Sequence, residues 1–187
     1  LFLVLMHAYQ NHVMPVFWGV LAFGIGMLMV YTSSTLYHGV QHIRLKNFFH
    51  RIDHMSIYFL IAGTYTPIVI MYMPRETATI FLGVMWGLVL VGVVLKLFSA
   101  TRFKIVSLTL YLLMGWMLVF LIKPAMQHIP HSVLGWVVAG GLSYTIGVYF
   151  FVRNRFTYSH AVWHIFVLGG TIAHYVCVYK SIQLAGI

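Results

Sequence analysis

The chain has 187 residues, of which 61% are hydrophobic and 7% are charged, and its formal net charge is +9. An ordinary soluble domain is about one-quarter charged, so this composition excludes a water-soluble globular class. Lys, Arg, Asp and Glu are absent from six runs: 1–43, 54–74, 77–95, 105–122, 124–152 and 156–179. Each run is long enough to cross roughly 30 Å of hydrocarbon as a helix. The pattern predicts an all-α integral membrane protein.

The first run is long enough for two helices, and the polar stretch YQNHVMP at 9–15 divides it. Pro15 is a typical helix starter. The segment before the break is short and begins with Leu, so we expect helix 1 to lack its N-terminal part. Six full helices should follow, at about 16–37, 53–73, 77–98, 105–123, 131–152 and 159–180. The prediction is one domain, 1–187, folded as a seven-transmembrane helix bundle with helix 1 truncated.

One helix carries a spacing that favours close packing. The stretch GVMWG at 83–87 places two glycines four residues apart. This GxxxG spacing allows two membrane helices to approach closely, although two glycines so spaced are common by chance.

The basic residues predict the orientation. Eight of the eleven Lys and Arg residues fall at one side of the predicted bundle, namely Arg44, Lys46, Arg51, Lys96, Arg102, Lys104, Arg153 and Arg155. The side richer in Lys and Arg is normally cytoplasmic. The N-terminus is therefore predicted inside and the C-terminus outside. A cytoplasmic basic surface predicts contact with anionic lipid headgroups and no nucleic-acid partner.

Polar residues collect at the same, cytoplasmic level of three helices. SSTLYHG (33–39) ends the second helix, RIDHMSIYF (51–59) begins the third, and SHAVWHIF (159–166) begins the seventh. His160 and His164 are four residues apart, which places both imidazoles on one helix face. Those two residues, together with His38, would give a metal three ligands.

Three histidines leave the fourth tetrahedral position open, as in catalytic rather than structural zinc sites. The open position would hold water, whose pKa zinc lowers to about 7. Asp53, one of two acids in the chain, could hold or deprotonate that water. Ser34, one turn before His38, could hydrogen-bond a ligand or substrate oxygen.

Each of these residues also has a structural alternative. The two histidines of helix 7 could be interfacial, Asp53 could cap the third helix, and Ser34 could bond a carbonyl of its own helix. Among the other histidines, His174 lies about 15 Å deeper than His164 and is interpreted as an internal hydrogen-bonding residue. His54 is expected to point elsewhere on its helix, and His50 to lie in the basic loop.

The stretches SSTLYHG, RIDHMSIYFLIAGTYTPI, WGLVLVGVVLKLF and HAVWHIFVLGG resemble the bacterial hemolysin III family. That family belongs to the progestin and adipoQ receptor superfamily, which includes the adiponectin receptors. The resemblance runs nearly from end to end and implies a seven-helix fold with a cytoplasm-facing zinc site. Relatives carry a further polar motif at the start of helix 1, and this chain begins after that point.

The resemblance also assigns residues. The family's Ser-x-x-x-His motif matches Ser34 and His38, its aspartate matches Asp53, and its final His-x-x-x-His matches His160 and His164. It implies three histidine zinc ligands, with Asp53 acting through the bound water. The related receptors and the alkaline ceramidases suggest hydrolysis of a lipid amide such as ceramide.

We therefore expect a zinc-dependent, ceramidase-like hydrolase involved in membrane lipid homeostasis, located in the plasma (inner) membrane of a bacterium. Two alternatives stay open. One is a receptor or membrane-state sensor in which zinc is structural. The other is a pore-forming cytolysin, as the family name indicates.

Overall fold

The computed structural model describes residues 5–6, 14–98, 103–153 and 157–185, and within them all regular secondary structure is helical. Six helices are long and apolar enough to cross a membrane: Met14–Gly39, Ile43–Tyr72, Arg75–Phe98, Lys104–His128, His131–Arg153 and Ser159–Leu184. These six confirm the predicted full helices. The predicted partial helix 1, with its break at 9–15, falls almost wholly outside the described residues.

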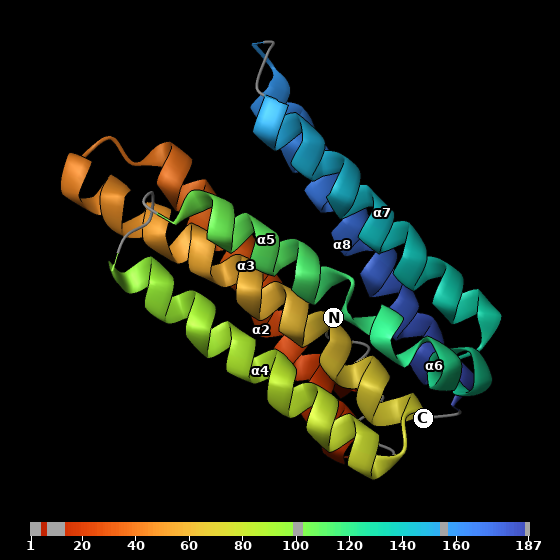
Figure 1. Cartoon of the computed structure of the whole chain (residues 1–187). Coiled ribbons are helices and arrows are strands. Elements are labelled where there is room, and N and C mark those ends of the chain that lie inside the picture. Colours follow the sequence, from red (N-terminus) through yellow and green to blue (C-terminus); the bar gives the residue numbers. More distant parts are fainter. Residues whose placement is uncertain (1–4, 7–13, 99–102, 154–156, 186–187) are drawn as a thin grey trace. The chain divides into compact units, whose positions relative to one another are not determined.

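The chain divides into two compact units, Leu1–Met117 and Leu118–Ile187. The described helices of unit 1 are α2 (Met14–Gly39), α3 (Ile43–Tyr72), α4 (Arg75–Phe98) and α5 (Lys104–Gly115). In Figure 1, α3 runs beside α2, and it also contacts α4 and α5. Helix α3 carries the longest run of buried residues in unit 1 and is therefore its central helix.

Glycines bring the backbones of α2 and α3 into close contact. A Cβ atom on Gly19 would lie 2.9 Å from Pro67 Cα, and one on Gly26 would lie 2.9 Å from the Cα of Leu60. A Cβ atom on Gly63 would lie 2.8 Å from the carbonyl oxygen of Ala22. Membrane helices gain little from the hydrophobic effect between them, so small residues that allow close packing hold such pairs together.

The GxxxG at 83–87 does not serve this purpose. A Cβ on Gly83 or Gly87 would meet no atom of the described residues within 4 Å. The spacing alone does not indicate which face of a helix a neighbouring helix covers, and no described residue of unit 1 covers this face of α4.

The start of α3 differs from the prediction. The helix begins at Ile43, with His42 as its N-cap, ten residues earlier than expected. Arg44 and Lys46 therefore lie in the helix and not in a loop. The charge-free run marks only the part of a helix that suits hydrocarbon, and no Gly or Pro stops the helix from extending into the polar layer.

The fifth predicted helix is interrupted. Helix α5 ends at Gly115 with Trp116 as its C-cap, and a 3₁₀ turn, η1 (Met117–Leu121), leads into α6 (Ile122–His128). The hydroxyl of Tyr65 on α3 donates a hydrogen bond to the Gly115 carbonyl. A side chain that takes a backbone acceptor in this way is a recognised cause of a helix break.

In unit 2, α6 precedes an antiparallel pair formed by α7 (His131–Arg153) and α8 (Ser159–Leu184). Figure 1 shows α7 and α8 side by side over most of their lengths. The two helices interlock through glycines and rings. Gly147 of α7 lies against Trp163 and Phe166, and Gly170 of α8 lies against the ring of Tyr144.

Candidate metal centre

The histidine pair of α8 has the geometry of two ligands for one ion. The helix begins at Ser159, so His160 and His164 occupy its first two turns. Their Nε2 atoms are 3.1 Å apart, with ring centroids 4.6 Å apart and ring planes at 90°. Two nitrogens bound to one tetrahedral zinc at 2.0–2.1 Å lie about 3.3 Å apart. The pair therefore fits a zinc ion with little adjustment.

Packing against α7 fixes the rotation of α8 and leaves the histidine face turned away from α7. Trp163 contacts the ring of Phe151 with centroids 5.2 Å apart, and Phe166 stacks on Phe150 at 5.4 Å. The hydroxyl of Ser143 donates a 2.7 Å hydrogen bond to the Phe166 carbonyl. His160 is exposed and His164 is partly exposed, as ligands that must admit an ion and water should be.

The third predicted ligand, His38, belongs to unit 1 and lies in the last turn of α2. Its imidazole is exposed. The neighbouring Tyr37 ring lies 4.7 Å from His38 and 4.9 Å from His50 of α3, measured between ring centroids. Tyr37 therefore joins the His38 end of α2 to the first part of α3.

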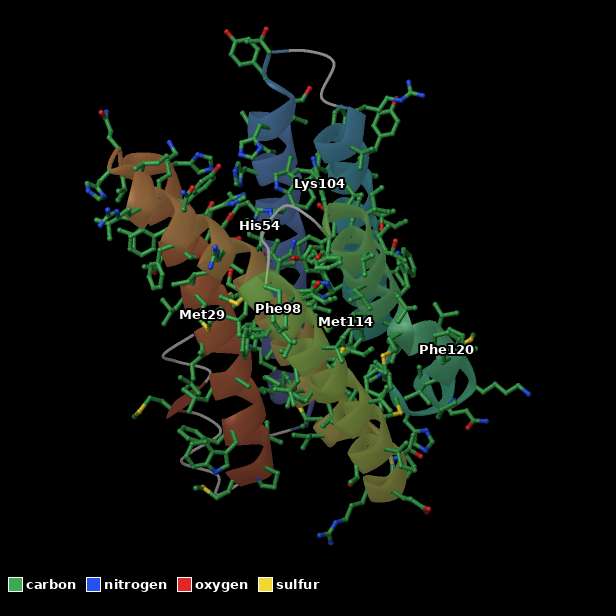
Figure 2. The ribbon with its side chains drawn as sticks, turned by 60° about the vertical axis from the view of Figure 1, so that its left-hand side comes forward. Met29, His54, Phe98, Lys104, Met114 and Phe120 are labelled. Carbon is green, nitrogen blue, oxygen red and sulfur yellow. The ribbon has the colours of Figure 1, made fainter. Side chains whose placement is uncertain are left out.

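Asp53 lies ten residues inside α3, so the alternative in which it caps that helix is wrong. Its side chain is 16% exposed, and its Oδ2 atom is 3.7 Å from Nδ1 of His54. His54, which Figure 2 labels on α3, follows Asp53 in the chain, and the two side chains are neighbours. A distance of 3.7 Å is too long for a hydrogen bond.

His50 is partly buried in α3 and not in a loop, because α3 starts before it. Its ring meets that of His54 at 4.4 Å between centroids. Helical spacing of four residues explains this contact as it explains the α8 pair. The sequence carried the same signal, which was missed because the helix was expected to begin at residue 53.

Ser33, the residue before the predicted site residue Ser34, links α2 to α3. The Ser33 hydroxyl is 3.3 Å from that of Ser56, which donates a 2.6 Å hydrogen bond to the Asp53 carbonyl. Ser33 and Ser56 are 3% and 0% exposed, whereas Ser34 is only partly buried. Ser34 remains one turn before His38 on α2, with a side chain accessible enough to meet a ligand.

His174 is buried in unit 2, as predicted. Its ring stacks on Tyr144 with centroids 5.6 Å apart, and its Nε2 would lie 2.5 Å from a Cβ on Gly140. Its Nδ1 atom has no hydrogen-bond partner among the described residues, in place of the internal hydrogen bond that was expected.

The six long apolar helices define a helical integral membrane protein. The family model described as Haemolysin-III related matches residues 1–175. The chain therefore belongs to the haemolysin III family, within the progestin and adipoQ receptor superfamily.

Individual proteins are also similar to this chain over most of its length. The chain is 38% identical over 156 residues to the Hemolysin-3 homolog of Bacillus subtilis (strain 168), covering 83% of this chain and 73% of that protein. It is 33% identical over 178 residues to Hemolysin-3 of Bacillus cereus, covering 95% and 81%. The human monocyte to macrophage differentiation factor is 30% identical over 164 residues, covering 84% and 68%.

Proposed function

We propose that this protein is a zinc-dependent hydrolase of a lipid amide, with the zinc held by His38, His160 and His164. The observation that carries the proposal is the 3.1 Å approach of the Nε2 atoms of His160 and His164 on a helix of otherwise apolar character. Ionisable groups in membrane helices are costly and tend to mark function. Imidazole nitrogens suit zinc well.

His38 is proposed as the third ligand on chemical grounds. Three imidazoles leave one coordination position open, which distinguishes catalytic zinc sites from structural ones. The bound zinc would supply Lewis acidity toward a carbonyl oxygen and would make water acidic near neutral pH. His38 is exposed at the end of α2.

Asp53 is proposed as the proton acceptor of the reaction. Its carboxylate is one of only two in the chain, and its side chain is 16% exposed, so it can meet water without being fully solvated. His54 Nδ1 lies 3.7 Å from this carboxylate. Ser34 would donate a hydrogen bond to a substrate oxygen.

The test is release of fatty acid from a ceramide-like lipid by purified, zinc-loaded protein. We expect turnover in the wild type and a loss of at least about 100-fold in Asp53→Asn, the range typical of a missing general base. Zinc content should be unchanged in that variant. Glu76→Gln is the matched control, since Glu76 is the other acid and lies in the first turn of α4. Full turnover in Asp53→Asn would exclude the role of Asp53.

A zinc that only joins helices gives a different result. In that case no lipid amide is hydrolysed, and loss of His38 lowers the thermal stability as far as chelation does. A receptor or membrane-state sensor would behave in this way.

Cytolysis is the second candidate, since two relatives carry the name Hemolysin-3. Cytolysis predicts that the purified protein releases dye from liposomes and that the His160→Ala variant releases as much dye as the wild type. If liposomes retain their dye at protein densities at which lipid hydrolysis is measurable, cytolysis is excluded.

A further inference from the structure

Residues 43–52 of α3, here named the basic extension, continue the helix beyond its membrane-spanning part. The charge-free run 54–74 is long enough to cross the hydrocarbon of a bilayer as a helix. Because α3 begins at Ile43, the basic extension leads directly into that run and is about 15 Å long. It therefore starts at the membrane surface, where lipid headgroups surround it.

One side of the basic extension faces α2. The ring centroid of Tyr37, on α2, lies 5.7 Å from the Lys46 Nζ atom and 4.9 Å from the ring centroid of His50. Lys46 and His50 are four residues apart and therefore share one face of the helix. The opposite face of the basic extension is turned away from α2.

The face turned away from α2 is apolar. Phe48 is 56% exposed and Leu45 is 49% exposed. At roughly 100° per residue, Phe48 lies about 160° around the helix from Lys46, and Leu45 lies about 60° from Phe48. Large apolar side chains exposed together on one face mark a surface at which the protein contacts another apolar body.

Two arginines border this apolar face. Arg44 and Arg51 are both exposed, and each lies about 40–60° from Phe48 around the helix. Asp53 lies about 160° from Arg51 around α3, and Glu76, the other acid of the chain, lies in the first turn of α4, next to the far end of α3. Neither guanidinium forms an ion pair with a described residue. The two positive charges are therefore placed for anions from outside the described chain.

We propose that the basic extension binds a membrane surface that contains anionic phospholipids. Phe48 and Leu45 insert at the boundary between headgroups and acyl chains, and Arg44 and Arg51 bind lipid phosphates. Amphipathic helices with Phe or Leu on one face and basic residues beside it bind anionic membranes in this way. The guanidinium group suits phosphate, because its planar N–H fork can donate two parallel hydrogen bonds.

The length of the basic extension has a geometric consequence. In an upright helix Leu45 would lie about 12 Å beyond Asp53 along the axis, whereas the headgroup layer on each side of a bilayer is about 5–8 Å thick. A helix longer than the bilayer can adapt by tilting. We therefore expect α3 to tilt so that Leu45 reaches the lipid.

A second copy of the chain is a poorer occupant of the apolar face. The helix that carries this face also crosses the membrane, so lipid is always beside it. Two copies packed through the same face would bring their arginines together, and like charges opposed in an interface are unfavourable. The proposal uses no residue of the candidate metal centre and is independent of the hydrolase function.

The first test measures lipid binding to the purified full chain in detergent by native mass spectrometry. We expect phosphatidylglycerol to bind more tightly than phosphatidylcholine. The Arg44→Gln, Arg51→Gln double variant should bind phosphatidylglycerol more weakly, by roughly fivefold for each arginine. The matched control is Arg75→Gln with Lys123→Gln, which removes the same charge from exposed positions outside the basic extension and should bind the lipid as the wild type does.

Two results of this test would overturn the proposal. Equal dissociation constants for phosphatidylglycerol in the wild type and in the arginine double variant would exclude lipid binding by these side chains. Displacement of phosphatidylglycerol by an equal concentration of inorganic phosphate would assign the arginines to a soluble anion instead.

The second test measures the depth of the apolar face in liposomes. A nitrobenzoxadiazole dye is attached to Phe48→Cys or, as the matched control, to Asn47→Cys, an exposed position about 100° away around the helix. Cys177, the one cysteine of the chain, is buried, so the introduced thiol takes the dye. Spin-labelled phosphatidylcholine should quench the dye more strongly at position 48 than at position 47, and equal quenching would contradict insertion. Self-quenching at position 48 that disappears when the protein is diluted in lipid would assign the face to a second copy.

Discussion

Replacing Gly63 by alanine tests whether backbone contact between α2 and α3 holds unit 1 together. The new Cβ would lie 2.8 Å from the Ala22 carbonyl oxygen and 3.0 Å from Phe23 Cα. Ordinary contact starts near 3.4 Å, so α2 must retreat by about 0.6 Å in an interior that is otherwise close-packed. Backbone atoms cannot rotate away as a side chain can, so the strain spreads along the helix pair.

Overpacking of this kind costs about 1–3 kcal/mol. Gly87→Ala on α4 is the matched control, because its Cβ meets no described atom within 4 Å. There the change should be neutral or stabilising by up to about 1 kcal/mol, the helix-propensity difference between Gly and Ala. At roughly 2–4 °C per kcal/mol for a chain of this size, the two variants should differ by several degrees in Tm. Equal Tm values for the two variants would refute the close-contact account.

Two further substitutions examine other contacts. Gly140→Ala should destabilise unit 2, because its Cβ would lie 2.5 Å from His174 Nε2 inside the α7–α8 pair. Gly135→Ala, with open space at its Cβ, should not destabilise the unit. Equal losses of stability for the two variants in scanning calorimetry would contradict this prediction. Tyr111→Phe should lower the free energy of unfolding by about 1 kcal/mol, since it removes the 2.6 Å hydrogen bond to the His54 carbonyl. A denaturant midpoint unchanged from the wild type would show that this hydrogen bond does not contribute to stability.

The six long helices were predictable because hydropathy is a local property of the chain. Each of the charge-free runs 54–74, 77–95, 124–152 and 156–179 lies mostly within one helix, and the ends of α4 and α7 agree with the prediction to within two residues. The beginning of α3 did not, because a helix continues into the polar layer wherever nothing stops it. The break at Gly115 was also out of reach, since it depends on a hydroxyl contributed by Tyr65, fifty residues away in sequence.

Of the candidate metal centre, the part that depends on spacing within one helix was predictable from the sequence. The approach of His160 and His164 follows from four-residue spacing within one helix, and it is confirmed. The contact of Ser33 with Ser56 between α2 and α3 was not predicted, because the rotation of α2 about its axis depends on tertiary contacts. The glycine contacts of α2 and α3 show the same limit, since the recognisable GxxxG lies on a different helix.

The most direct test of the account is the zinc content of the purified protein, measured by elemental analysis. We predict about one zinc per wild-type chain and a large loss in the His160→Ala, His164→Ala double variant. The control is His128→Ala with His131→Ala, which removes two exposed histidines outside the proposed site and should keep the metal. Equal zinc in the wild type and the His160, His164 double variant would contradict the proposed metal centre and the hydrolase function that rests on it.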